Sequence, residues 1–270
     1  MTTGPGDRWV AGDAYEAYMG RWSRPLARGF VEWLHPAVAA QWLEIGCGTG
    51  ALTATISECG EPASVVACDP SAPFIEHARA HLQDARVSFT VTGADALPHR
   101  PGGFDIVVSG LVLNFVPDIE EVLRSVCDRL RPAGVVAAYV WDYAEGMEFL
   151  RFFWEEAAAL DSRAKELDEG RRFPLCRPQA LASVFRVAGL SNVETDALEI
   201  ATDFSTFDDY WTPFLQGTGP APGYVASLDP PNRELLRARL EERLSPSNGP
   251  IHLRARAWAV RGVKPLASIS

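Results

Sequence analysis

The chain has 270 residues, 47% of them hydrophobic, so it is long enough to bury a full core as one domain with an insertion. Its formal net charge of −10 argues against nucleic acid as a partner, because sequence-independent binding to phosphates depends on clustered lysine and arginine. No charged start precedes an apolar run, and no stretch approaches the roughly 18 apolar residues of a membrane span, so we expect a cytoplasmic protein with no membrane partner.

The first predicted element is a helix over residues 13–34, which carries aromatic side chains at mixed helical spacings. A helix of this kind can close over a cleft, although aromatic residues more often supply buried area. We assign residues 1–37 to an N-terminal helical cap.

Short apolar runs then alternate with helical stretches, a pattern typical of βα units that build a parallel sheet. The predicted strands are residues 42–45, 64–68, 87–91, 105–108 and 135–140. Their near-continuous apolar character indicates strands that are covered on both faces. Helices are predicted over residues 72–83 and 118–130, each preceded by side chains that can cap a helix.

The rest of the chain continues with helices and strands of less regular spacing. Residues 147–169 are predicted to form one charged amphipathic helix, and residues 177–188 a second helix that ends at Gly189. Two more strands are predicted over residues 192–200 and 253–260.

An insertion of residues 203–251, rich in proline, glycine and aromatic residues, separates these last two strands. It has one clear predicted helix, residues 230–244. Loops of this length are more often functional than idle. Its side chains Tyr210, Trp211, Phe214 and Tyr224 suggest a pocket for a flat or lipophilic small molecule.

A glycine-rich loop, Glu44-Ile45-Gly46-Cys47-Gly48-Thr49-Gly50, follows the first predicted strand and precedes a helix. Glycines allow a sharp turn and leave room for a ligand against the main chain, so this arrangement is typical of nucleotide binding. The spacing is not that of the dinucleotide fingerprint. A carboxylate at Glu44 would repel a pyrophosphate but suits a cationic amino group.

Polar residues also follow the next three predicted strands. Asp69 comes roughly 20 residues after the loop, where a carboxylate can accept hydrogen bonds from a ribose diol. Asp95 follows the third strand and Ser109 follows the fourth. These strand ends are expected to line one crevice, where open α/β sheets bind ligands.

In this order and spacing, the four segments resemble the class I S-adenosylmethionine (SAM) dependent methyltransferases, specifically the small-molecule branch that includes the ubiquinone and menaquinone methyltransferases. The resemblance covers residues 40–141, and residues 15–24 look like the leading helix of the same branch. It implies an α/β fold: a Rossmann-like, doubly wound, seven-stranded, mostly parallel sheet with an N-terminal helical cap and an insertion before the last strand. Residues 1–270 would then be a single domain.

Within that domain, residues 38–202 and 252–262 are expected to form the SAM-binding core, and residues 203–251 an acceptor-side insertion. The implied cofactor is SAM, and the product is S-adenosylhomocysteine. The implied cofactor-binding residues are Tyr18, Arg21, Glu44, Gly46, Cys47, Gly48, Gly50, Asp69, Pro70, Ser71, Asp95, Ala96 and Ser109. No metal is expected, because the five cysteines and five histidines lack the spacing of a metal site.

The resemblance also implies individual roles for these residues. The loop backbone would pack on the methionine and ribose, Asp69 would hold the ribose hydroxyls, and Pro70 and Ser71 would flank the adenine. Asp95 would accept from the adenine amino group, with a backbone contact from the residue after it, and Ser109 would lie near the methionine amino group. The leading helix would reach the methionine carboxylate through Tyr18 and Arg21.

Methyl transfer mainly requires that acceptor and methyl group be aligned and water excluded, so no covalent nucleophile is expected. Many members of the branch carry a histidine where this chain has Asn114, which leaves the general base open. Asp142, Tyr143 and His252 are candidates for it.

The sequence predicts SAM-dependent methyl transfer to a small-molecule acceptor that is aromatic or lipophilic. A non-catalytic SAM-binding protein and a nicotinamide (NAD) dependent oxidoreductase are the alternatives. The acceptor, the methylated atom and the oligomeric state are not determined by the sequence.

Overall fold

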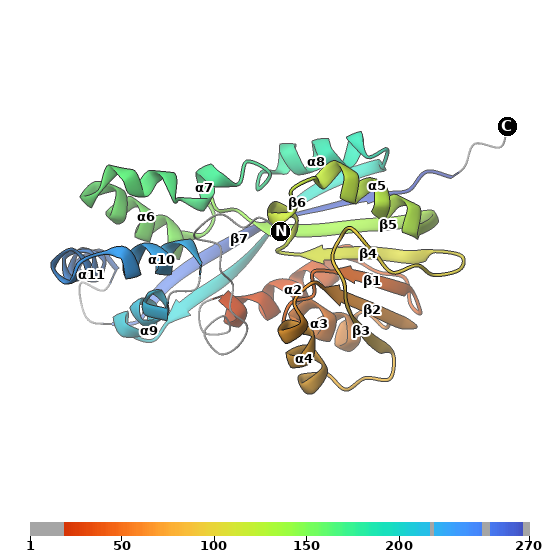
Figure 1. Cartoon of the computed structure of the whole chain (residues 1–270), viewed down its shortest axis with the longest axis horizontal. Coiled ribbons are helices and arrows are strands. Elements are labelled where there is room, and N and C mark those ends of the chain that lie inside the picture. The colour runs from red at the N-terminus through yellow and green to blue at the C-terminus, as the bar shows by residue number, and fades with distance from the viewer. Residues whose placement is uncertain (1–18, 217–218, 245–248, 267–270) are drawn as a thin grey trace.

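Seven strands form one sheet in the order β3-β2-β1-β4-β5-β7-β6 in the computed structural model, which describes residues 19–216, 219–244 and 249–266 (Figure 1). The strands are β1 (Gln41–Ile45), β2 (Ser64–Asp69), β3 (Val87–Val91), β4 (Phe104–Gly110), β5 (Leu130–Trp141), β6 (Ser191–Phe204) and β7 (Ile251–Val263). The pairs among β1 to β5 are parallel, and β7 runs antiparallel to both β5 and β6. The predicted doubly wound, mostly parallel sheet is confirmed.

Helices cover both faces of this sheet, as the apolar strands predicted. On one face lie α2 (Arg21–Leu34), α3 (Ala51–Cys59) and α4 (Ala72–His81). On the other lie α5 (Ile119–Arg129) and α8 (Pro178–Val187) (Figure 1). Among the described residues, no helix is long and apolar enough to cross a membrane.

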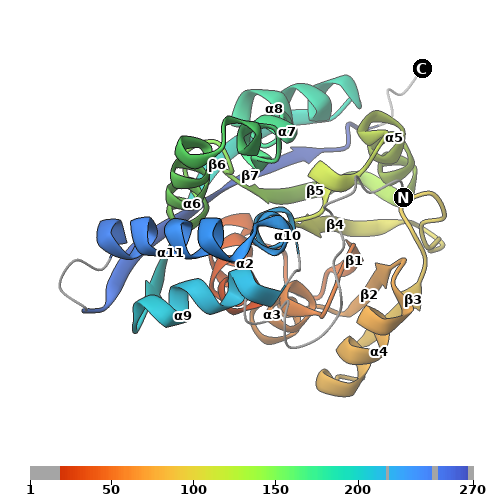
Figure 2. The same ribbon diagram turned by 60° about the vertical axis from the view of Figure 1, so that its left-hand side comes forward.

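The last two strands are longer than predicted, because they pair with each other well beyond the edge of the parallel strands. Trp141, the last residue of β5, pairs with Ala257, whereas the ladder between β6 and β7 continues to the pair Phe204 and Ile251. Strands β6 and β7 together form a two-stranded ribbon, the β6–β7 ribbon, that continues past β5 from residue 257 to residue 251 of β7. At about 3.3 Å per residue, this extension is about 20 Å long. The insertion is attached at its far end (Figure 2).

The single helix predicted over residues 147–169 is wrong. The segment forms α6 (Glu148–Leu160), the 3-10 helix η3 (Ser162–Glu166) and the short helix α7 (Glu169–Arg172). The carboxylates of Asp161 and Asp168 accept hydrogen bonds from backbone N–H groups two residues later and so cap η3 and α7. Each cap starts a new helix where the charge pattern suggested one continuous face.

The insertion is more helical than predicted. Residues 230–244 form α11 (Pro230–Leu244), as expected, but α9 (Phe207–Trp211), η4 (Thr212–Gln216) and α10 (Pro220–Ser227) precede it. These three are too short for a periodic pattern to reveal them. Together with α6, they lie beyond the carboxyl ends of the parallel strands (Figure 2).

The four aromatic side chains predicted to line an acceptor pocket in the insertion are instead buried in packing. Phe214 is fully buried and stacks on Phe153 of α6, with ring centroids 4.6 Å apart and planes 8° apart. The Tyr210 hydroxyl donates to the backbone oxygen of Phe149 at 2.8 Å. The other two, Trp211 and Tyr224, are 4% and 6% exposed. Their apolar area holds the insertion on α6 and β6.

The aromatic residues of α2 are also core residues. Trp22 is 8% exposed, and Phe30 is fully buried against Tyr139 of β5, with ring centroids 4.6 Å apart. These contacts fix α2 on the sheet. Residues 13–18 of the predicted helix, including Tyr18, lie outside the described part of the chain.

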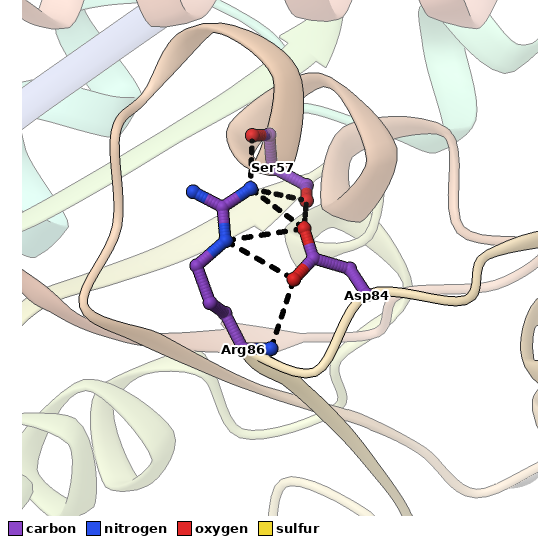
Figure 3. Close-up of polar contacts among 3 residues, drawn as sticks. All are labelled: Ser57, Asp84 and Arg86. Atoms are coloured by element: carbon purple, nitrogen blue, oxygen red, sulfur yellow. Dashed lines mark hydrogen bonds and ion pairs between the residues drawn. The ribbon is translucent and has the colours of Figure 1, made fainter.

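A polar network closes the end of the sheet opposite the carboxyl ends. Arg86, just before β3, donates to the Asp84 carboxylate and to the backbone oxygen of Ser57 near the end of α3 (Figure 3). The Ser57 hydroxyl donates to the same carboxylate. The hydrogen bonds from Arg86 and Ser57 hold the pKa of Asp84 well below its usual range. This network joins α3 to the start of the edge strand β3.

Candidate functional site

The glycine loop crosses from the end of β1 to α3 and is tied to the end of β2. The backbone N–H groups of Gly46 and Cys47 both donate to the backbone oxygen of Cys68, at 2.8 and 3.0 Å. Gly46, Gly48 and Gly50 have φ values of 72°, 52° and 91°. All three lie in the left-handed region, which glycine enters without steric cost, so the loop conformation depends on the glycines.

Two of these glycines face different surroundings. A Cβ atom at Gly46 would lie 2.6 Å from a methyl carbon of Val112, so the loop packs there against the segment after β4. A Cβ atom at Gly48 would meet no atom of the described residues within 4 Å. The loop is therefore packed on one side and open at its tip, where a ligand can lie against the backbone.

Asp69, the last residue of β2, holds this loop in place. Its carboxylate accepts from the backbone N–H of Gly48 at 3.0 Å and from that of Ser71 at 2.8 Å. It is 7% exposed, and burial raises its pKa while the two hydrogen bonds oppose the rise. A carboxylate has about four acceptor positions, so about two are left for the hydroxyls of a ribose.

Glu44 lies in β1 beneath the loop and is 1% exposed. Thr53 lies in the first turn of α3, just after the loop, and its hydroxyl donates to the Glu44 carboxylate at 2.6 Å. Burial raises the pKa of Glu44 from its ordinary 4.5 to about 7; the Thr53 hydrogen bond opposes this and the charge of Asp69 adds to it. A cation bound nearby would favour the ionised carboxylate.

The residues predicted to surround an adenine ring lie near one another at the ends of β2 and β3. The backbone N–H of Thr92 donates to the backbone oxygen of Asp69 at 3.1 Å, which joins the two strand ends. A Cβ atom at Gly93 would lie 2.6 Å from an Asp95 carboxylate oxygen and 3.9 Å from Pro70. Asp95 and Ala96 are exposed at this edge, so both can reach a ligand.

Two predicted cofactor residues have other partners in the structure. The Ser109 hydroxyl is buried and donates to the backbone oxygen of Ile45 at 3.0 Å. Arg21 forms an ion pair with Asp209 of α9 at 2.7 Å and donates to the backbone oxygen of Asp203 at 2.9 Å. The Arg21 guanidinium therefore joins α2 to the insertion, and its predicted contact with a methionine carboxylate would require it to leave that pair.

A second feature of the site is a small cavity of about 10 Å³ near the carboxyl ends of β4 and β5. Most of its wall is apolar and comes from segments far apart in the sequence: Met19, Phe115, Leu150, Phe173 and Pro220. The other two lining residues, Tyr143 and Glu169, are polar. A cavity of this volume accommodates about one water-sized group.

The three candidates for a general base are separated by the fold. Tyr143 lines the cavity. The Asp142 carboxylate forms an ion pair with Arg256, 2.6 Å from a guanidinium nitrogen, and Asp142 is not among the residues that line the cavity. His252 is 75% exposed on the β6–β7 ribbon and contacts Asp203 at 2.8 Å. Of the three, the structure brings only Tyr143 to the cavity.

Glu169 is the functional candidate that sequence reasoning missed. It is 4% exposed, and the Trp154 indole N–H donates to its carboxylate at 2.5 Å. Burial raises its pKa from 4.5 to about 7, against the hydrogen bonds from its own backbone and Trp154. In the sequence it is one acid among several on what looked like a solvated helix face, so no local signal distinguished it.

Asn114, which stands where a histidine was expected, is in the 3-10 helix η2 (Leu113–Phe115) after β4. Its side-chain nitrogen is buried and has no hydrogen-bond partner among the described residues. Within that same part of the chain, no group of three or more His, Cys, Asp or Glu side chains is placed to hold a metal ion.

The donor set fits SAM better than a pyrophosphate cofactor. Glu44 and Asp69 place two carboxylates at neighbouring strand ends, where they would repel phosphates and attract a cationic amino acid group. The open backbone at Gly48 and the remaining acceptor positions of Asp69 suit the ribose.

Comparison with known proteins supports a methyltransferase that uses SAM. Residues 43–134 match a family model described as a methyltransferase domain. The ubiquinone biosynthesis O-methyltransferase of Chelativorans sp. (strain BNC1) is 36% identical over 96 residues, which are 35% of this chain and 37% of that protein. The mitochondrial protein of that name from Homo sapiens is 27% identical over 187 residues, 65% of this chain and 47% of the relative. This chain thus matches less than half the length of each.

A similar fold is found in phosphoethanolamine N-methyltransferase 2 of Haemonchus contortus, solved with S-adenosyl-L-methionine. The TM-score is 0.58 with 17% sequence identity, over 93% of this chain and 56% of that one. The glycine loop and Asp69 lie within the matched residues 43–134, at the strand ends where the resemblance predicted them. Residues 43–134 thus form a methyltransferase domain, and the chain is similar in sequence to the quinone methyltransferases of the class I SAM-dependent type.

Proposed function

We propose that this chain transfers the methyl group of SAM to a small-molecule acceptor that binds beside the carboxyl ends of β4 and β5. The observation that carries the proposal is the glycine loop, open at Gly48 and held by Asp69. This loop lies where the sheet order places β1 between β2 and β4, the position at which doubly wound sheets bind ligands.

Each of these residues would bind a different part of SAM. Asp69 would accept from the ribose hydroxyls, the backbone around Gly48 would pack on the ligand, and Glu44 would supply a negative charge for the amino group. When bound, SAM supplies a methyl group made electrophilic by the sulfonium. The chain then has to hold the acceptor in line and exclude water, which can contribute roughly 7 to 11 kcal/mol to lowering the barrier.

An aromatic or lipophilic acceptor is the class that we propose. Five of the seven residues around the small cavity are apolar, and Phe115 and Phe173 pack edge to face with ring centroids 5.1 Å apart. The relatives named for ubiquinone biosynthesis and for demethylmenaquinone methylation support the same class. Apolar walls with few polar groups are typical of sites for such molecules.

Cofactor binding is tested by titrating the purified chain with SAM, S-adenosylhomocysteine and NAD. The two adenosyl ligands are expected to raise the melting temperature, with a stabilisation of about 2.7 kcal/mol at 100 times Kd, and NAD is not. Asp69→Ala is expected to lose this response, whereas Asp84→Ala, at the opposite end of the sheet, keeps it. Stabilisation by NAD instead would favour the oxidoreductase.

Activity is tested with methyl-labelled SAM and a panel of phenols, quinols and amines. Label in an extractable product, with equal formation of S-adenosylhomocysteine, is the expected result. Tight SAM binding without turnover across the panel would favour a non-catalytic SAM-binding protein.

A further inference from the structure

We propose that Glu169 is the catalytic residue that takes the proton from the acceptor, and that the reacting group of the acceptor is an uncharged hydroxyl. The inference rests on the proposed function and adds to it a base and a class of acceptor group. Its starting point is that, among the residues that the structure describes, Glu169 and Tyr143 are the two polar ones that line the cavity between Met19, Phe115, Phe173 and Pro220.

The fold positions Glu169 beside the strand ends with little freedom to move. A Cβ atom at Gly170 would lie 2.8 Å from the backbone oxygen of Tyr143 and 2.9 Å from the Cα atom of Ala144, so α7 abuts the segment after β5. Asp168 caps α7 and also accepts from Arg151 of α6 at 2.9 Å. These contacts hold the backbone of α7 from two sides, and with it Glu169, which lines the cavity.

Trp154 of α6 sets the orientation of the carboxyl group. Its indole N–H donates to Oε2 of Glu169 at 2.5 Å, and both side chains are at most 4% exposed. An indole can only donate, so this oxygen accepts in either protonation state of Glu169. The remaining charged groups that act on Glu169 are Asp168, which disfavours its ionised form, and Arg151, which favours it.

These surroundings suit a residue that gains a proton near neutral pH. A base works best when its pKa is near the working pH, and burial brings the pKa of Glu169 to about 7. An exposed glutamate titrates near pH 4.3 and would be a much weaker base.

The walls of the cavity favour a hydroxyl over an amine. An alkylamine is a cation at neutral pH and would have to lose its water shell among Phe115, Phe173 and Met19, at a cost of several kcal/mol. A neutral hydroxyl is desolvated at lower cost and can donate a hydrogen bond to the carboxylate. The cavity of about 10 Å³ also has room for one oxygen-sized group.

The step balances in atoms and charge. The acceptor O–H bond breaks and its proton goes to the Glu169 carboxylate, which becomes a neutral acid. The electron pair of the acceptor oxygen forms the new O–CH₃ bond as the C–S bond of the sulfonium breaks. One anion and one cation are consumed, and the products are the methyl ether, the carboxylic acid and the neutral thioether.

The test compares Glu169→Gln with wild type, using catechol and phenol as acceptors and benzylamine and phenethylamine, both cations at neutral pH, as their amine counterparts. The amide of Glu169→Gln keeps the size of the side chain and an oxygen for the Trp154 N–H, so the fold and S-adenosylhomocysteine binding are expected to persist. Turnover of the hydroxyl acceptors is expected to fall by about 10² to 10⁴, the usual contribution of a general base. Glu166→Gln, an exposed carboxylate on η3, is the matched control and should leave turnover unchanged.

Two further measurements separate a base from a structural residue. Glu44 also has a pKa of about 7, so infrared spectra are recorded without cofactor in a Glu44→Gln background. They are expected to show a protonated carboxyl group that ionises near pH 7 and that disappears when Glu169→Gln is added. Trp154→Phe removes a hydrogen bond to the ionised carboxylate, so the acid limb of the pH–rate profile is expected to move to higher pH. A purely structural Glu169 would not move that limb.

The outcomes distinguish this inference from the proposed function. If wild type binds SAM but methylates no acceptor in the panel, the proposed function fails. If wild type is active and Glu169→Gln stays within threefold of it, or the infrared signal of the Glu44→Gln background persists after Glu169→Gln is added, Glu169 is not the base. Turnover of the amines alone would overturn the hydroxyl acceptor.

Discussion

Gly46 and Gly48 share a left-handed backbone, but their different surroundings predict different effects of substitution by alanine. Gly46→Ala places a Cβ atom against Val112, whereas the Cβ atom of Gly48→Ala has no described residue within 4 Å. Both variants are destabilised by roughly 1 to 2 kcal/mol, because alanine is strained in the left-handed backbone conformation. Urea unfolding should therefore show Gly46→Ala to be the less stable of the two.

Ligand binding by the same pair tests the location of the cofactor. Gly48→Ala fills the space at the tip of the loop, so we expect calorimetric titration to show at least tenfold weaker binding of S-adenosylhomocysteine, about 1.4 kcal/mol. Unchanged affinity in this variant would place the ligand away from the Gly48 backbone.

The raised pKa of Glu44 predicts how the free energy of unfolding depends on pH. Its pKa is raised from 4.5 to about 7 by burial, so the stability linked to it is fully present below pH 4.5 and is lost as pH rises through about 7. Glu44→Gln keeps an acceptor for Thr53 and cannot ionise. The free energy of unfolding of Glu44→Gln minus that of wild type is therefore expected to increase by roughly 2 kcal/mol as the pH rises from about 5 to about 8.

Urea titrations of both proteins at the two pH values measure this change. Glu169 has a raised pKa in both proteins and so cancels in the comparison. A difference between wild type and Glu44→Gln that does not vary with pH would show that Glu44 titrates normally in the folded chain.

At the scale of elements, the close approach of α7 to the segment after β5 depends on Gly170. Gly170→Ala would push α7 away from the backbone of Tyr143 and carry Glu169 with it. We expect kcat to fall while the affinity for S-adenosylhomocysteine stays the same, because the glycine loop is untouched.

The matched control for this variant is Gly223→Ala in α10. A Cβ atom there meets nothing within 4 Å, and alanine favours a helix by up to about 1 kcal/mol over glycine, so this variant should be as stable as wild type or slightly more so. Equal kcat values for the two variants would show that the position of α7 does not matter to the reaction.

Over the whole molecule, the insertion is held by aromatic packing and by the Arg21–Asp209 ion pair. Phe214→Ala removes a fully buried ring stacked on Phe153 and is expected to cost about 3 to 5 kcal/mol. Limited proteolysis should then cut the insertion faster, while Leu215→Ala, next to it and 51% exposed, behaves like wild type. Equal cleavage of both variants would mean that the ring stack does not anchor the insertion.

Prediction from the sequence succeeded where local pattern determines structure. Strands buried on both faces read as apolar runs, so β3 was predicted with its observed bounds and β1, β2 and β4 to within two residues. It failed at residues 147–169, because the carboxylates of Asp161 and Asp168 serve as caps only when the backbone turns there. In a sequence, an aspartate that caps a helix cannot be distinguished from an aspartate that is simply exposed on a helix surface.

The glycine loop, Glu44 and Asp69 were determined by the sequence, because parallel strands bring their carboxyl ends to one edge whatever the rest of the chain does. Only the tertiary structure decided the other half of the site. The cavity wall joins Met19 to Pro220 across two hundred residues, and burial by those distant segments alone changes the pKa of Glu169. Local sequence carries no record of such contacts, since desolvation depends on what the whole fold packs around a side chain.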